Sequence, residues 1–255
     1  MAEQRKKPIF ASLDTAGEQL AERLLAYKNS DAVVLAIPRE GVATGFEVAK
    51  RLLLPLDVLS VRTLHSPVQQ SMEIGAIAEG NVIVVDENAI DTAGTTASEL
   101  EYVLGQEQSE MNRRIFNYRN DRSLEYLKKQ TVLVVDMGRT TGYVAKAAVR
   151  TLRALEVSQA VLAVPVCSTQ ALETVRDEYD DIVCVESQDS VQDITQFYEE
   201  FSPLTDDEVI ALLKRAKTEI PKELKGQIAQ KHAKMDQTLP IIENKSGITG
   251  FRESD

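Results

Sequence analysis

The stretch Val132-Leu-Val-Val-Asp-Met-Gly-Arg-Thr-Thr-Gly-Tyr-Val144 decides the fold of this chain. An apolar run ends at Asp136, a short turn rich in Gly and Thr follows, and helical spacing begins at Tyr143. This order predicts a buried strand, a turn and the N-terminus of a helix, where backbone N–H groups and hydroxyls can hold an anion. The same residues could equally serve only the turn and the helix cap. The pattern alone leaves both interpretations open.

The alternation of strand and helix recurs along the chain. Apolar runs predict strands at residues 31–38, 56–62, 82–86, 131–136, 159–166 and 182–186. Helical spacing of apolar residues predicts helices at 16–27, 42–54, 98–118, 143–155 and 169–179. Continuous apolar strands that alternate with helices are typical of a parallel sheet covered on both faces. We therefore expect an α/β fold with a doubly wound, mostly parallel sheet and a ligand crevice beyond the carboxyl ends of its strands.

The C-terminal part of the chain follows a different pattern. Thr205 and Glu208 form an S/T-x-x-E capping signature, which predicts a helix that runs through Ala216. From Pro221 on, the sequence is charged and lacks long apolar faces. We expect a domain of residues 1–217 that includes this helical extension, and a charged tail of residues 218–255 that is partly helical or mobile.

Charge and composition exclude several classes of protein. Forty acidic residues against 29 basic ones give a net charge of −11, which repels a polyanion, so we expect no nucleic-acid partner. The apolar runs are too short to cross a bilayer and no apolar signal region follows the N-terminus, which predicts no membrane partner and a cytoplasmic location. Cys167 and Cys184 lie in apolar runs, which favours buried reduced thiols over a disulfide or a metal site.

Several blocks of the sequence resemble the type I phosphoribosyltransferase family. Residues 132–144 look like the loop that holds phosphoribosyl pyrophosphate (PRPP). Further blocks that resemble a bacterial group of this family, in the same order, lie at residues 36–42, 56–62, 74–80, 163–166 and 197–202. The resemblance implies the fold of that family and an enzyme of nucleotide salvage that transfers ribose 5-phosphate to or from a nitrogenous base. It also implies Mg²⁺ as cofactor, PRPP or a nucleotide as small-molecule partner, and a homodimer.

The resemblance also implies roles for individual residues. Asp136 would contact the ribose hydroxyls and, indirectly, the Mg²⁺, and the catalytic residues would be Arg39, Arg62 and Asp136. The substrate-binding residues would be Glu40, Gly41, Asp136, Gly138, Arg139, Thr140, Thr141 and Gly142. Residues 63–78 would form a flexible flap that closes over the substrates.

The sequence departs from the family pattern at the positions that would do this work. Met137 stands where the family has a second acid, Tyr143 where it has a small residue, and Val144 where it has a hydroxyl. Glu40 replaces a glycine and Thr63 a basic residue. Each lost hydrogen bond to a phosphate would cost about 1.5–3 kcal/mol. The alternative is therefore a non-catalytic protein of this fold that binds a nucleotide or sugar phosphate as a regulatory or assembly module.

A second stretch, residues 82–96, competes for the role of ribose-phosphate loop. It also ends an apolar strand in two acids, Asp86 and Glu87, and it is similar to the loop of phosphoribosyl-pyrophosphate synthetases. Its turn is longer by a residue, and the neighbouring blocks place a helix start here. Thr95, Thr96 and Glu99 then act as capping residues, and the competing site remains a minority alternative.

Overall fold

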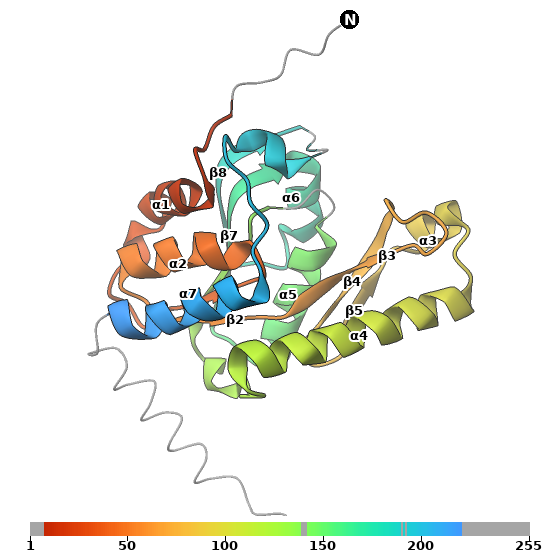
Figure 1. Ribbon diagram of the computed structural model, residues 1–255, viewed down its shortest axis with the longest axis horizontal. Helices are drawn as coiled ribbons and strands as arrows, with labels where there is room; N and C mark the ends of the chain where they lie inside the picture. Colours follow the sequence, from red (N-terminus) through yellow and green to blue (C-terminus); the bar gives the residue numbers. More distant parts are fainter. Residues whose placement is uncertain (1–7, 139–141, 190, 192, 221–255) are drawn as a thin grey trace, which may run out of the picture.

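The computed structural model describes residues 8–138, 142–189, 191 and 193–220. Its centre is a five-stranded parallel sheet with the strand order β2-β1-β6-β7-β8 (Figure 1). The strands are β1 (Val33–Ala36), β2 (Leu56–Val58), β6 (Thr131–Val135), β7 (Gln159–Ser168) and β8 (Asp181–Gln188). The predicted α/β fold with a mostly parallel sheet is confirmed.

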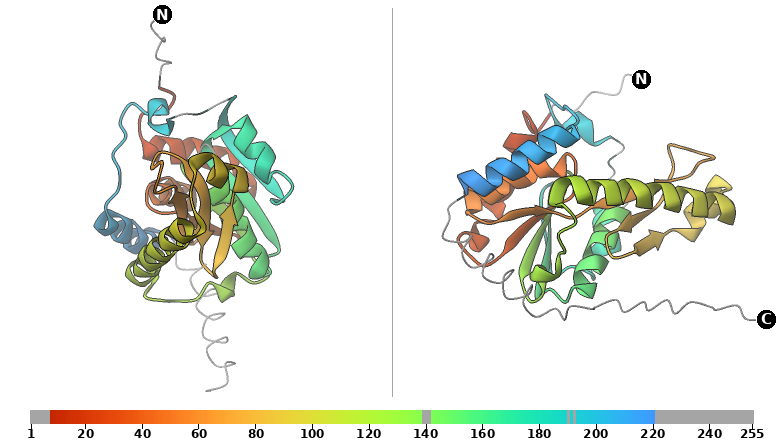
Figure 2. Two further views of the ribbon diagram at one scale, coloured as in Figure 1. Left: turned by 90° about the vertical axis from the view of Figure 1, so that its right-hand side faces the viewer. Right: turned by 60° about the horizontal axis from the view of Figure 1, so that its bottom comes forward.

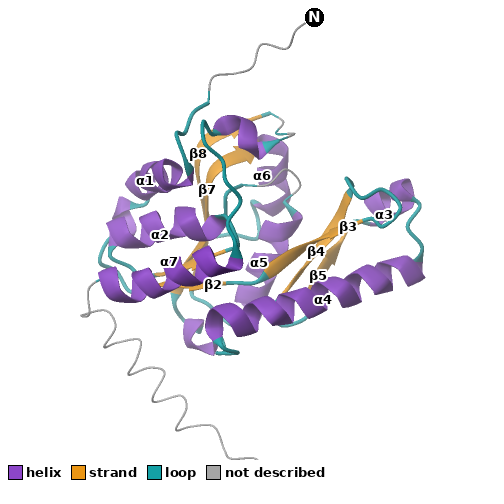
Figure 3. Cartoon of the chain, in the orientation of Figure 1, coloured by secondary structure: helices purple, strands orange, loops and turns teal. Residues whose placement is uncertain are grey.

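Helices cover both faces of the parallel sheet (Figure 3). On one face lie α1 (Leu13–Arg23), α2 (Gly41–Leu52) and α7 (Asp206–Glu219), and on the other α5 (Tyr143–Ala154) and α6 (Thr169–Val175). Successive strand residues point to opposite faces, so Leu133 packs towards α2 while Val134 packs towards α5. Both faces are buried, which explains why the strands read as continuous apolar runs.

A second sheet, which the sequence analysis did not predict, projects from the first (Figures 1 and 2). It is antiparallel with the order β3-β4-β5, and its strands are β3 (Val61–His65), β4 (Glu73–Ala78) and β5 (Val82–Val85). The prediction of residues 56–62 as one strand of the parallel sheet was wrong, because the chain changes sheets between β2 and β3. Residues 82–86 were also assigned to the wrong sheet. The predicted flap, residues 63–78, forms most of the β3–β4 hairpin.

The second sheet is covered by the 23-residue helix α4 (Ala97–Arg119), which follows the short helix α3 (Glu87–Ala93). Leu64 and Ile77 of the sheet pack against Met111 of α4. Thr96 and Glu99 form a capping box at the start of α4, as predicted. Short 3₁₀ helices lie at η1 (Leu25–Tyr27), η2 (Glu125–Leu127) and η3 (Ile194–Phe197).

The C-terminal helix α7 has the predicted start. Thr205 and Glu208 form its capping box, and the helix ends at Glu219. Residues 221–255 lie outside the described part of the chain, so the predicted division at residue 217 stays a prediction. Among the described residues, no helix combines the length and the apolar character that a membrane span requires.

The two cysteines correct a further prediction. Cys167 of β7 and Cys184 of β8 form a disulfide, with their Cα atoms 6.6 Å apart. The prediction of reduced thiols was wrong. Cys167 is buried and Cys184 is half-buried, and their apolar runs do not show that the two strands are neighbours in the sheet.

Candidate functional site

The two predicted loops meet at one edge of the parallel sheet. Strands β1 and β6 are adjacent and parallel, so the residues after them emerge side by side. The backbone N–H of Ile37 donates to Val135 O, at 2.9 Å. A Cβ on Gly41 would lie 3.3 Å from Asp136 Cα and 3.6 Å from Asp136 Oδ1. The start of α2 therefore packs directly against Asp136, and a side chain at position 41 would press on the backbone of Val135 and Asp136.

The first loop consists of Pro38, Arg39 and Glu40, and leads straight into α2. The peptide bond between Pro38 and Arg39 is cis. Arg39 and Glu40 are half-buried, and the Glu40 side chain makes no capping hydrogen bond to the helix. The first N–H groups of a helix carry a positive partial charge. This end of α2 is therefore suited to an anion, with Arg39 beside it as a cation.

Asp136 is buried where β6 ends. It is 6% exposed, its Oδ1 accepts a hydrogen bond of 2.8 Å from the Met137 N–H, and its own N–H donates to Ala163 O on β7, at 3.3 Å. These contacts hold the carboxylate at the edge of the sheet. The half-buried Met137 thus contributes a backbone N–H, and not a second acid, at this position.

Two glycines bound the rest of the predicted phosphate loop. Gly138 and Gly142 have φ angles of +96° and +79°, which side chains rarely adopt. A Cβ on Gly138 would lie 1.9 Å from Val166 O, and one on Gly142 would lie 2.5 Å from Thr174 Oγ1. The ends of the loop are thus fixed against β7 and α6. Arg139, Thr140 and Thr141, which the resemblance assigns to the phosphate, lie outside the described residues.

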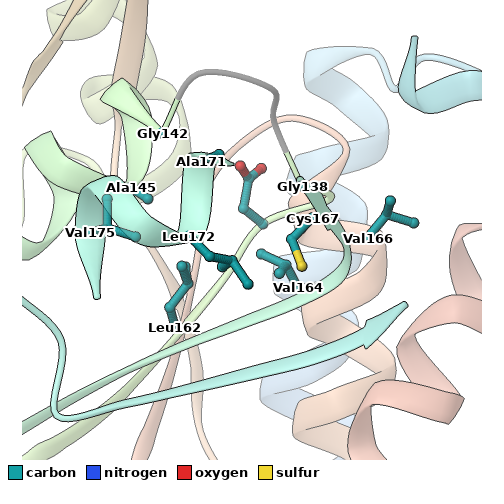
Figure 4. Close-up of a pocket in the computed structure, with 11 residues that line it drawn as sticks. Gly138, Gly142, Ala145, Leu162, Val164, Val166, Cys167, Ala171, Leu172 and Val175 are labelled. Carbon is teal, nitrogen blue, oxygen red and sulfur yellow. The ribbon is translucent and has the colours of Figure 1, made fainter. Parts of the chain in front are cut away.

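A small cavity lies beneath these glycines (Figure 4). Its volume is about 30 Å³, and of the described residues that line it Asp136 alone is charged. Figure 4 shows Leu162 of β7 and Leu172 of α6 lying towards one another within it. This volume is comparable to that of one water molecule. A nucleotide does not fit inside this cavity.

Tyr143 and Val144 explain two departures from the family pattern. The Tyr143 hydroxyl donates to Asp86 Oδ2, at 2.7 Å, so its side chain reaches towards the second sheet. That hydrogen bond is the main reason why the pKa of Asp86 is lowered, whereas burial and the Asp86 contact raise the pKa of Tyr143. Val144 is 2% exposed within the core. A hydroxyl at position 144 would consequently lie in apolar surroundings.

Arg62 lies outside the parallel sheet that carries the two loops. It lies on β3 of the second sheet, and its Nε donates to Glu107 Oε2 of α4, at 2.6 Å. The described contacts tie its side chain to α4. The catalytic role of Arg62 stays a prediction.

The competing stretch, residues 82–96, forms strand β5, helix α3 and the N-caps of α3 and α4. Asp86 Oδ1 accepts a hydrogen bond from the Ala89 N–H, at 3.0 Å, and caps α3. Thr96 caps α4 as predicted, but Thr95 instead shares a buried hydrogen bond of 2.8 Å with Ser66. The polar groups of this stretch therefore cap helices and bond to other parts of the fold, which favours the edge beside Asp136 as the ligand site.

The sequence analysis missed Tyr198. Its hydroxyl is buried and has no hydrogen-bond partner within the part of the chain that the structure describes. Burial, and secondly the charge of Asp136, raise the pKa of Tyr198. The residue belongs to the block 197–202 that resembles the family, but no spacing in the sequence places that block near Asp136.

The site is suited to Mg²⁺ only together with a ligand. No three His, Cys, Asp or Glu side chains gather into a metal site among the residues described. Asp136 and Glu40 supply carboxylates from the two loops. Mg²⁺ is commonly held by one or two carboxylates together with substrate phosphates, so these residues fit an ion that arrives with a pyrophosphate.

Known proteins are similar to this chain in sequence and in fold. Residues 7–202 match the family described as "Phosphoribosyl transferase domain". Two curated Mycobacterium tuberculosis proteins, from strains CDC 1551 and H37Rv, are each named "Putative phosphoribosyl transferase" and are 36% identical over 208 residues. The match covers 82% of this chain and 47% of theirs, so the chain spans about half their length. The crystal structure of TT1426 from Thermus thermophilus is 31% identical with a TM-score of 0.64, over 80% of this chain and 97% of that one.

Proposed function

The chain belongs to the phosphoribosyl transferase domain family, and we propose that it transfers ribose 5-phosphate between pyrophosphate and a nitrogenous base. The observation that carries this proposal is the packing of Gly41 against Asp136. A Cβ on Gly41 would lie 3.6 Å from Asp136 Oδ1. It brings the predicted pyrophosphate loop and the predicted ribose-phosphate loop to one edge of the sheet. A single PRPP molecule carries both groups that these loops would hold.

Each part of the edge would hold a different part of PRPP. The N-terminus of α2 and Arg39 would bind the pyrophosphate, and Asp136 would accept hydrogen bonds from the ribose hydroxyls. Residues 138–142 would surround the 5-phosphate. In the transfer, the bond from the anomeric carbon to pyrophosphate breaks and a bond to a ring nitrogen of the base forms. When bound, Mg²⁺ would neutralise charge on the departing pyrophosphate.

A binding role without turnover is the second candidate, and Met137 is the observation that favours it. Its backbone N–H contacts Asp136, but its side chain offers the ribose no carboxylate. If the loop has only lost this acid, Met137→Asp should strengthen PRPP binding. Unchanged or weaker binding in this variant would count against that explanation.

Turnover of the full chain tests the proposed activity. We expect pyrophosphate release from PRPP and Mg²⁺ in the presence of one base from a panel of purines, pyrimidines and related heterocycles. Asp136→Asn should abolish release. The matched control, Asp86→Asn, changes an acid at the end of another strand and should leave release intact. A folded protein that binds PRPP but releases no pyrophosphate with any base would support the binding role instead.

The cytoplasmic location also stays a proposal. The family and the acidic composition are in keeping with it, whereas the disulfide between Cys167 and Cys184 is more typical of oxidising compartments. Measuring the free thiols of protein that is alkylated at the moment of lysis would show which state the cell maintains.

A further inference from the structure

A cavity of about 310 Å³ lies where the second sheet meets the ends of two helices, and the proposed function does not use it. It is lined by the β4–β5 turn, by the C-terminal ends of α4 and α5, and by the segment that follows α4. Pockets for small molecules typically have volumes of about 300–1,000 Å³, whereas the cavity beside Asp136 measures about 30 Å³. The larger cavity therefore has room for a small organic molecule.

This cavity is separate from the candidate site at the edge of the parallel sheet. Helix α5 begins at Tyr143, directly after the predicted phosphate loop, and ends at Ala154, which lines the cavity. A helix rises 1.5 Å per residue, so the two ends of α5 lie about 17 Å apart. A molecule in the cavity would therefore lie away from the predicted phosphate loop.

Arg119 is a buried cation in the wall of this cavity, and two of its nitrogens are unused. It is the last residue of α4 and is 7% exposed. Its Nη2 donates to Glu79 Oε2, but its Nε and Nη1 are buried and have no hydrogen-bond partner within the described part of the chain. Buried N–H groups without an acceptor cost stability, so native proteins nearly always satisfy them. The unused donors of Arg119 indicate that the cavity holds an acceptor.

The rest of the lining combines apolar side chains with a polar rim. Ile115 and Leu155 are among the apolar lining residues. Directly after α4 the chain reverses, because Asn120 and Asp121 have φ angles of +53° and +56°. This reversal brings the exposed Asp121 and Glu125 to the cavity. Apolar walls with a few polar groups that fix the orientation of a ligand are typical of small-molecule sites.

The charges around the cavity favour an uncharged ligand. Among the described lining residues, the carboxylates of Glu79, Asp121 and Glu125 outnumber the guanidinium groups of Arg119 and Arg122. Each of the two guanidinium groups already donates to a carboxylate. The chain as a whole carries a net charge of −11, so an anion would be repelled. A cation would face the Arg119 guanidinium, whose unused donors require an acceptor.

We propose that this cavity binds a small uncharged heterocycle of the cyclic amide class, in which a carbonyl stands beside a ring N–H. The carbonyl oxygen would accept hydrogen bonds from the unused donors of Arg119. The ring N–H would donate to Glu79, whose carboxylate accepts from the Ser60 N–H at 2.7 Å and from Arg119, and has acceptor positions left. The flat ring would pack against Ile115 and Leu155.

Equilibrium dialysis of the full chain with labelled uracil, thymine and hypoxanthine, without PRPP or Mg²⁺, tests this site. At least one of these uncharged cyclic amides should bind to the wild type. Arg119→Lys keeps a positive charge beside Glu79 but removes the unused donors, so it should weaken binding roughly 10-fold or more. Ala154→Trp places a bulky ring at an exposed helix position that lines the cavity, and should abolish binding. The matched control is Ala97→Trp at the exposed start of α4, which should bind as the wild type does.

The proposed function also involves a base, so two variants separate the cavity from the candidate active site. Asp136→Asn should bind the heterocycle as the wild type does, and Ala154→Trp should bind PRPP as the wild type does, so either proposal can fail alone. If none of the three compounds binds to the wild type, the proposal is overturned. Binding that is lost in Asp136→Asn but kept in Ala154→Trp would overturn it equally. Competition by inorganic phosphate for the same site would contradict the uncharged class of ligand.

Discussion

The Tyr143 hydroxyl lies 2.7 Å from the Asp86 carboxylate and joins the first residue of α5 to the N-cap of α3. Both residues looked unusual in the sequence, Tyr143 because it replaces a small residue and Asp86 because it opens a rival loop. In the structure they are partners. Their contact ties α5, the helix that follows the predicted phosphate loop, to the second sheet. One hydrogen bond therefore explains both the tyrosine at position 143 and the aspartate at position 86.

Tyr143→Phe should lower the free energy of unfolding by about 1 kcal/mol, because it removes a hydrogen bond to a carboxylate that is partly open to solvent. Denaturant unfolding measures this loss. Asp86→Ala removes the same bond and also the cap of α3, so it should cost more. In a double-mutant cycle, the Tyr143 change should have little further effect once Asp86 is gone. Fully additive losses would contradict the contact.

Tyr198→Phe should leave the free energy of unfolding unchanged or raise it by up to about 1 kcal/mol. The Tyr198 hydroxyl is buried without a partner among the described residues, so its removal relieves an unsatisfied polar group. Thermal unfolding by calorimetry measures the change. A loss above about 1 kcal/mol would show that the hydroxyl has a bonding partner in solution.

Removal of the disulfide should destabilise the chain by about 3 kcal/mol, the value expected for a crosslink that closes a loop of this length. Cys167 and Cys184 are 17 positions apart in sequence. Wild-type protein should unfold at a lower denaturant concentration after reduction, whereas a Cys167→Ser, Cys184→Ser double variant should be insensitive to reductant. Equal stability of oxidised and reduced wild type would contradict this prediction.

Stability below neutral pH should depend on Glu110. The pKa of Glu110 is lowered to about 2, mainly because the Arg113 guanidinium donates a hydrogen bond to its carboxylate. A carboxylate with a lowered pKa in the folded state stabilises the fold above its unfolded pKa, about 4.3, and loses this contribution as pH falls towards 2. Between about pH 5 and pH 2, wild type should therefore lose more stability than Glu110→Gln. Parallel curves for the two proteins would show that this ion pair contributes nothing.

The features that could be predicted from the sequence are those that depend on neighbouring residues. The end of β6 before Asp136 and the start of α5 at Tyr143 lie close together in the sequence, so periodicity and turn residues were sufficient to predict both. The capping boxes at Thr96 and Thr205 are local in the same way.

The features that could not be predicted depend on which distant segments meet. Apolar residues 82–85 indicate a strand, but they do not indicate that it joins the second sheet beside β4. Glu79 and Arg119 are 40 positions apart and form a buried ion pair that no local pattern reveals. The Cys167–Cys184 bond and the Tyr143–Asp86 contact escaped for the same reason.

Isothermal titration of the full chain with PRPP and Mg²⁺ tests most directly whether the edge beside Asp136 is the ligand site. We predict that wild type and Asp86→Asn bind PRPP with similar affinity, and that Asp136→Asn loses roughly 10-fold or more, because it removes the charge of a buried carboxylate that would accept hydrogen bonds from the ribose. Binding that survives in Asp136→Asn but is lost in Asp86→Asn would contradict the account and move the site to residues 86–96.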